Sequence, residues 1–240
     1  VCIRGQPVLA CTTAAIRRCR PAPWHSALGL LLLMTTLPAI HVQAERPVMV
    51  REGLLYATPE GARLRLTLWL PKERAHVLRP AVVIVHGGAW MTGTRQQMRW
   101  YGHRLARQGY VAASISYRKM PRFAFPDCLE DAKAAVRWMR AQAETYRIVP
   151  ERIYALGNSA GGHLATMLAA TPHVDEFEGD QNLGHSSAIR AAVALYPPVD
   201  LRVYRDPETW IRIAGVSTRL VERFVGGSSR GSDLPFLAAS

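Results

Sequence analysis

The sequence predicts an α/β protein with a doubly wound, mostly parallel sheet and an antiparallel hairpin leading into it. Three observations support this prediction. Short, continuously apolar runs such as "AVVIVH" at 81–86 are typical of parallel strands that are buried on both faces. Apolar residues with helical spacing fill stretches between these runs. A segment that alternates polar and apolar residues, "RLRLTLWL" at 63–70, precedes them and indicates a half-buried strand.

The predicted elements follow a regular order along the chain. The hairpin pairs residues 47–57, "PVMVREGLLYA", with residues 63–70 across a turn at 58–61. The later predicted strands lie at 81–86, 110–117, 152–158 and 189–197. With helices between them, the order is β-β-β-α-β-α-β-α-β, which is typical of a doubly wound sheet.

The clearest predicted helix begins near Asp127, which we expect to be its N-cap, with Glu130 three residues further on. Apolar residues then recur at helical spacing: Leu129, Ala132, Val136, Met139 and Ala143. Toward the end of the chain, we expect residues 203–230 to form cap or connecting helices.

Residues 1–44 differ in character from the rest and predict an N-terminal extension with an export signal. Arg17, Arg18 and Arg20 precede the apolar run 27–34, and small residues follow up to Ala44. We therefore expect cleavage after Ala44, a periplasmic or secreted protein, and no stable membrane anchor after cleavage. Residues 45–240 then form a partial α/β domain.

Composition excludes some classes of function. Removing residues 1–44 takes away four arginines and no acidic residue, so the formal net charge of +12 falls by four to +8. The basic residues are scattered, which predicts a solvated arginine-rich surface, and no nucleic-acid-binding motif accompanies them. Cys128 is the one cysteine after Ala44, so no internal disulfide is expected. No cofactor or metal is expected either.

The segment "GNSAG", from Gly157 to Gly161, matches the G-x-S-x-G pattern between a predicted strand and a predicted helix. Such a turn is sharp, so small residues are required on both sides of the serine. It raises the hydroxyl of Ser159 above the sheet and directs the first amides of the helix at developing negative charge. Ser159 is therefore the candidate nucleophile.

A second segment strengthens this interpretation. "HGGAW", residues 86–90, follows the first predicted parallel strand, where this architecture places further backbone donors for an oxyanion. Two independent motifs in the expected order favour a nucleophilic serine over a helix that merely begins with small residues.

These motifs resemble the α/β-hydrolase superfamily, and within it the hormone-sensitive-lipase-like and feruloyl-esterase-like (BD-FAE) carboxylesterases. The resemblance is carried by "HGGAW", "GYVAASISYR", "FPDCLEDAKAAVRWMR", "GNSAGGHLA" and "ALYPPVDL". It implies that Ser159 attacks the carbonyl of a short-chain, aryl or carbohydrate-linked ester. It also implies that the backbone N–H groups of Gly88, Ala89 and Ala160 hold the oxyanion.

The rest of the catalytic machinery is not found in the sequence. A serine nucleophile needs a histidine base and a carboxylate, and this architecture has the chain order Ser, acid, His. The last histidine, His185, precedes the predicted strand at 189–197, so no histidine in this chain is in the expected place. His163 is expected to pack or form a hydrogen bond. Asp200 is a candidate acid, although a structural role is favoured.

We therefore expect a chain that is truncated at its C-terminus, with an incomplete sheet and little activity of its own. Two alternatives remain open at the level of the sequence. An arylformamidase-type amidase would use the same residues on a formamide. A catalytically dead α/β-hydrolase domain would instead serve as a binding module, and the oligomeric state is open in every case.

Overall fold

The computed structural model describes residues 47–72, 77–204, 217–226 and 238–240. The predicted export signal and its cleavage after Ala44 lie outside the described residues. Of the predicted cap or connecting helices at 203–230, the described part contains one helix, α5 (Thr218–Phe224).

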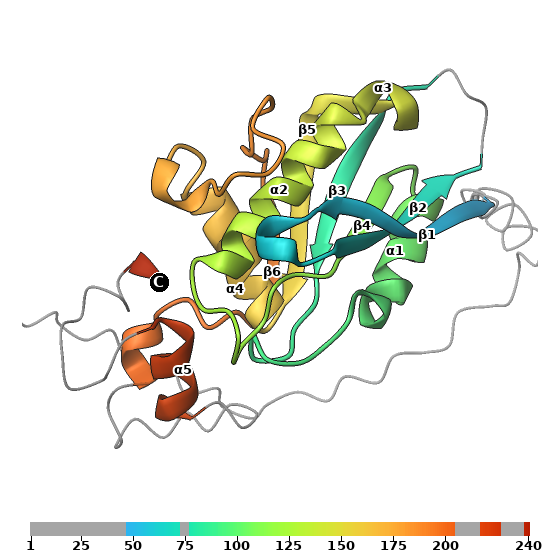
Figure 1. Ribbon diagram of the computed structural model, residues 1–240. Helices are drawn as coiled ribbons and strands as arrows, with labels where there is room; N and C mark the ends of the chain where they lie inside the picture. Colours follow the sequence, from blue (N-terminus) through green and yellow to red (C-terminus); the bar gives the residue numbers. More distant parts are fainter. Residues whose placement is uncertain (1–46, 73–76, 205–216, 227–237) are drawn as a thin grey trace, which may run out of the picture. The chain divides into compact units, whose positions relative to one another are not determined.

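The described residues contain a six-stranded sheet with the order β1-β2-β4-β3-β5-β6 (Figure 1). The strands are β1 (Val48–Ala57), β2 (Leu64–Pro71), β3 (Arg79–Val85), β4 (Val111–Ile115), β5 (Ile148–Asn158) and β6 (Ala192–Leu195). β1 pairs antiparallel with β2, and β2 pairs antiparallel with β4, whereas β4, β3, β5 and β6 are parallel. The predicted fold class and the leading hairpin are therefore confirmed. β6 is shorter than the predicted strand at 189–197, and β5 begins four residues earlier than predicted.

Helices connect the parallel strands. The α-helices are α1 (Arg99–Arg107), α2 (Asp127–Ala141), α3 (Ala143–Tyr146), α4 (Ala160–Ala170) and α5. Short 3-10 segments are η2 (Pro59–Gly61), η3 (Arg95–Met98), η4 (Asp175–Phe177) and η5 (Leu201–Tyr204). Within the described ranges, no helix has the length and apolar character needed to cross a membrane.

The central strands β3 and β4 are buried on both faces, as their uninterrupted apolar sequences predict, whereas the outer strands β1 and β6 are partly exposed. Along β3, Val83 and Val85 belong to the larger core cluster with α2 and α4, while Val82 and Ile84 belong to a second cluster. That second cluster includes Ala106 of α1. Alternate residues of one strand thus contact helices on opposite faces, which is the doubly wound arrangement.

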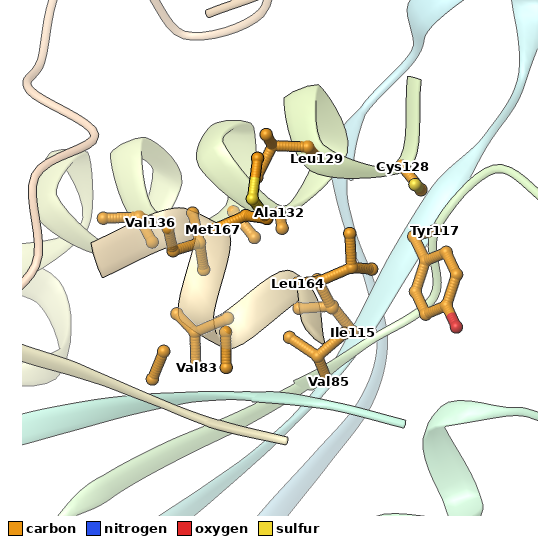
Figure 2. Packing of buried hydrophobic residues seen from close by; sticks show 14 of the residues in the cluster. Val83, Val85, Ile115, Tyr117, Cys128, Leu129, Ala132, Val136, Leu164 and Met167 are labelled. Carbon is orange, nitrogen blue, oxygen red and sulfur yellow. The ribbon is translucent and has the colours of Figure 1, made fainter. Parts of the chain in front are cut away.

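The larger cluster supports the element that carries the candidate nucleophile. Figure 2 shows side chains of α2 pointing toward Leu164 and Met167 of α4, with Val83, Val85 and Ile115 of the sheet beneath them. Leu164, Val83, Val85 and Ile115 are fully buried. α4 therefore packs against both the sheet and α2, and its first turn has a defined position.

The start of α2 differs from the prediction. Pro126 is the N-cap and Asp127 is the first helical residue, and no side chain caps the helix. The carboxylate of Asp127 instead accepts from the backbone N–H of Ala124 and pairs with Arg118 at 3.0 Å. Glu130 also pairs with Arg118, at 2.9 Å. Both acids are bound to a buried cation, which the local sequence pattern does not reveal.

The predicted solvated arginine-rich surface is wrong for several cations. Arg118, Lys133 and Arg137 are buried. Arg118 also donates to Asp131, and Lys133 and Arg137 both pair with Glu178. Because Glu178 directly follows η4, these pairs attach the long connection between α4 and β6 to α2.

Candidate active site

Ser159 lies at a sharp bend between β5, which ends at Asn158, and α4, which begins at Ala160. Its backbone has φ 52° and ψ −124°, a conformation that non-glycine residues rarely adopt and that is typical of strained functional turns. Its N–H donates to the carbonyl of Leu195 in β6 at 2.9 Å. The residue is half-buried, so its hydroxyl group is not enclosed in the core.

The glycines on either side of Ser159 are required by close backbone contacts. A Cβ atom at Gly157 would lie 2.0 Å from the carbonyl oxygen of Gly161. A Cβ atom at Gly161 would lie 2.2 Å from the carbonyl oxygen of Val85. Neither separation is possible for real atoms, so any larger residue would push α4 away from β5 or from β3. The sharp turn therefore requires the two glycines of the G-x-S-x-G pattern.

The loop that follows β3 lies directly against this turn. A Cβ atom at Gly87 would lie 3.3 Å from the Cβ atom of Ser159. In this loop, residues 86–90, which we call the oxyanion loop after its predicted role, three consecutive residues have positive φ: Gly88 (122°), Ala89 (51°) and Trp90 (56°). Positive φ raises the conformational energy of the two non-glycine residues, and backbone strain of this kind is concentrated at functional sites.

In the oxyanion loop, hydrogen bonds accepted by the backbone carbonyl groups fix the directions in which the amide N–H groups point. Nδ1 of His86 is 2.7 Å from the carbonyl oxygen of Gly87, and the carbonyl of Gly88 accepts from the N–H of Met91 at 3.0 Å. In a trans peptide the C=O and the following N–H point in opposite directions. The N–H groups of Gly88 and Ala89 are therefore turned away from these partners.

The same reasoning applies to Ala160 at the start of α4. The carbonyl of Ser159 accepts from the N–H of His163 at 2.9 Å, so the N–H of Ala160 points back past the N-terminus of the helix. Within the part of the chain that the structure describes, no acceptor binds the N–H groups of Gly88, Ala89 or Ala160. The structure thus leaves three candidate donors free beside the serine.

Asn158 connects the two loops, a contact that sequence analysis did not identify. Its Oδ1 accepts from the N–H of Gly87 at 3.0 Å, and its Nδ2 donates to the hydroxyl of Tyr196 at 3.1 Å. The residue that precedes the candidate nucleophile therefore holds the oxyanion loop at its closest approach. The motif gives this position no fixed identity, so only the fold reveals the contact.

Residues after β4 support the oxyanion loop from the other side. The hydroxyl of Tyr117 donates to the carbonyl of His86 at 3.0 Å, and the two rings stack with centroids 4.5 Å apart. The N–H of Met120 donates to the carbonyl of Trp90 at 3.0 Å. Beyond the loop, Nζ of Lys119 donates to the carbonyl of Gly93 at 2.7 Å.

Neither buried histidine near the serine is arranged as a general base. Nε2 of His163 is 2.5 Å from the carbonyl of Ala239, and its ring meets Trp90 edge to face. Because a carbonyl only accepts, Nε2 of His163 and Nδ1 of His86 carry the protons of these bonds. Burial lowers the pKa of each residue to about 4, so both are neutral at pH 7. Each imidazole forms its hydrogen bond with a backbone carbonyl rather than with Ser159.

Asp200 follows β6 in a partly exposed loop. Its carboxylate accepts from Nε and Nη2 of Arg202, at 2.8 and 2.7 Å, and from the backbone N–H of the same residue. The hydrogen bond from the Arg202 side chain lowers the pKa of Asp200. In the described residues no histidine binds this carboxylate, so its partner is local. The structure also gathers no group of three potential metal ligands in those ranges.

A cavity of about 210 Å³ lies next to the oxyanion loop, between Met91 and α5. Met91, Met120, Pro121 and Leu220 supply apolar surface, and Arg219 and Arg223 supply positive charge. α5 is connected to the loop through the stacked rings of Phe224 and Trp90, whose centroids are 4.1 Å apart. The cavity is large enough for a small organic group.

A family model matches residues 66–233 of the chain, and its description is BD-FAE. The chain belongs to the BD-FAE family. Esterase LipC of Mycobacterium tuberculosis is 31% identical to this BD-FAE chain over 175 residues, which are 72% of this chain and 43% of LipC. Isoprenylcysteine alpha-carbonyl methylesterase ICME of Arabidopsis thaliana is 31% identical over 146 residues, which are 61% of this chain and 34% of that protein.

Solved structures are also similar to this BD-FAE chain. The apo form of Thermogutta terrifontis esterase 2 matches it with a TM-score of 0.59 and 29% sequence identity, over 75% of this chain and 62% of that chain. The α/β-hydrolase resemblance that the sequence motifs predict is thereby confirmed. The chain spans less than half the length of the curated relatives named above.

Proposed function

We propose that this BD-FAE chain is part of a serine carboxylic-ester hydrolase in which Ser159 is the nucleophile. The observation that carries the proposal is the position of Ser159 on a strained turn beside three amides with no other acceptor among the described residues. The esterase names of its relatives support the same class of reaction.

The proposed reaction has two stages. Oγ of Ser159 attacks the ester carbonyl carbon and loses its proton to a base, and the carbonyl oxygen becomes an oxyanion held by Gly88, Ala89 and Ala160. The C–O bond to the alcohol then breaks, and the alcohol leaves with a proton from the base. Water attacks the acyl-serine by the same route and releases the carboxylic acid and free Ser159.

Among the described residues, no side chain is placed to act as this base. His86 and His163 bind backbone carbonyls, and Asp200 binds Arg202. We therefore propose that the acid and the histidine lie outside the described residues, and that the 240-residue chain alone turns over very slowly. Loss of the base from a serine triad typically lowers turnover on the order of 10⁶-fold.

For the substrate, we propose an ester with a short or aryl acyl group. The cavity beside the oxyanion loop is small, and structures of Thermogutta terrifontis esterase 2 contain propionate and butyrate. We also propose that the protein is exported, on the basis of the arginine-rich and apolar pattern within residues 1–44.

The test compares the parent sequence with the Ser159→Ala variant in two proteins, the 240-residue chain and the product of the full reading frame. Hydrolysis of p-nitrophenyl acetate and labelling by a fluorophosphonate probe are measured in each. We expect labelling and turnover in the longer protein, both lost with Ser159→Ala, and little of either in the 240-residue chain. Strong labelling of the shorter chain would show that a base is present within it. Turnover that survives Ser159→Ala would overturn the proposed mechanism.

A further inference from the structure

A cationic cavity lies at the opposite end of the sheet from Ser159. Its volume is about 170 Å³, and it is lined by residues of β1, β2, β3 and β4 and of the connection that enters β5. Arg79 begins β3, whereas the oxyanion loop follows the end of that strand seven residues later. At roughly 3.3 Å per residue, the two sites are about 23 Å apart.

Among the described residues that line this cavity, three are arginines and none is acidic: Arg51, Arg79 and Arg147. Arg79 is only 7% exposed, yet its side chain has no hydrogen bond or ion pair within the described residues. Its backbone N–H donates to the carbonyl of Arg147 at 2.8 Å, which brings the two residues together. Arg51 lies over the ring of Tyr146, with Cζ 5.8 Å from the ring centroid.

The contrast with Arg118 shows that this arrangement is unusual in the protein. Arg118 is equally buried, and it pairs with Asp127, Glu130 and Asp131 at 2.9 to 3.0 Å. A buried guanidinium without such a partner loses hydration and gains nothing in return, and neighbouring like charges add repulsion. An anion in the cavity would supply the missing partner.

We propose that this cavity binds a small organic carboxylate. A guanidinium presents paired N–H donors that match the two oxygens of a carboxylate, and Arg79 would provide them at the base of the cavity. Arg51 and Arg147 stand exposed at its rim. Met49, Leu70 and Val111 form an apolar wall that suits a short hydrocarbon or aromatic group rather than an inorganic ion. The proposal does not depend on the chemistry of Ser159.

The experiment is calorimetric titration of the 240-residue chain with benzoate and, separately, with inorganic phosphate, at constant ionic strength. We expect saturable one-site binding of benzoate and weaker binding of phosphate. Arg79→Gln should weaken benzoate binding by about tenfold or more, because a hydrogen bond to a charged group is lost. Arg190→Gln, at an exposed arginine outside the cavity, is the matched control and should bind like the parent protein.

A second variant keeps the test decisive if the Arg79→Gln protein does not fold. Arg51 is exposed, so Arg51→Gln should leave the fold intact and still weaken benzoate binding several-fold. Absence of saturable benzoate binding overturns the proposal. So does equal binding by the parent, Arg51→Gln and Arg79→Gln proteins. Phosphate binding as tight as that of benzoate shows that the apolar wall plays no part and overturns the assignment to organic carboxylates.

Discussion

The two loops of the candidate site follow neighbouring parallel strands, but they are held in different ways. The turn at Ser159 after β5 is shaped by its own small residues, because Gly157 and Gly161 allow backbone contacts that any side chain would prevent. The oxyanion loop after β3 is shaped by side chains from elsewhere, chiefly Asn158 and Tyr117. The shape of the serine turn thus depends on the small size of neighbouring residues, whereas the shape of the oxyanion loop depends on hydrogen bonds to residues distant in the sequence. Substitutions should therefore disrupt the two loops in different ways.

The largest effect is expected from Gly161→Ala. The added methyl would lie 2.2 Å from the carbonyl oxygen of Val85, so α4 must move away from β3. We expect a loss of about 3 kcal/mol or more in the free energy of unfolding, measured by urea titration, and, in the product of the full reading frame, loss of probe labelling at Ser159. Gly184→Ala is the control, because a Cβ atom there meets nothing within 4 Å and should change stability by under about 0.5 kcal/mol. Similar effects at both glycines would contradict the steric account.

The oxyanion loop is tested by Asn158→Ala. This change leaves the N–H of Gly87 without its acceptor and frees the loop from the serine turn. In the product of the full reading frame, we expect kcat to fall about 10²-fold with KM nearly unchanged, because the amides act on the transition state. Stability should fall by about 1 to 3 kcal/mol. An unchanged kcat would show that the loop holds its shape without Asn158.

A pH titration tests the burial of His163 behind the serine turn, because burial lowers the pKa of this residue, while its hydrogen bond to the carbonyl of Ala239 has the opposite effect. The pKa of His163 is about 4 in the folded protein and near 6.5 when unfolded, so the unfolded chain takes up a proton first as pH falls. Its contribution to stability is complete above pH 6.5 and is lost progressively toward pH 4. Between pH 7 and pH 5 we expect His163 to account for a loss of about 2 kcal/mol. His163→Gln should show a correspondingly shallower dependence, and parallel curves for the two proteins would contradict this assignment.

The smallest effect is expected from Tyr196→Phe. It removes the hydroxyl that accepts from Asn158 Nδ2 but leaves the bond from Gly87 to Asn158 intact. Tyr196 is 69% exposed, so water can replace the hydroxyl, and stability should change by under about 0.5 kcal/mol. We expect kcat to fall less than about threefold by the same ester assay. A loss as large as that of Asn158→Ala would mean that Tyr196, rather than Asn158, positions the loop.

The difference between features set by neighbouring residues and features set by long-range contacts also explains what could be predicted from the sequence. The hairpin, the buried strands and the turn at Ser159 depend on local periodicity and on the size of neighbouring residues, and these are visible in the chain. The role of Asn158 depends on a bond to Gly87, which is 71 residues away. The predicted start of α2 was wrong because Asp127 and Glu130 bind Arg118, which follows β4, rather than the helix backbone. That the Arg79 side chain has no partner among the described residues likewise becomes visible only when β1, β3 and α3 are brought together.

The hydrogen bond from Ser159 to Leu195 has a consequence for the order of events in synthesis. β6 is the last strand of the described sheet to leave the ribosome, and it emerges 33 to 36 residues after Ser159. Until it docks beside β5, the candidate nucleophile Ser159 lacks the acceptor that its amide has in the folded protein. In the product of the full reading frame, Ser159 should therefore not react with an activated phosphonate before this strand has been translated and paired.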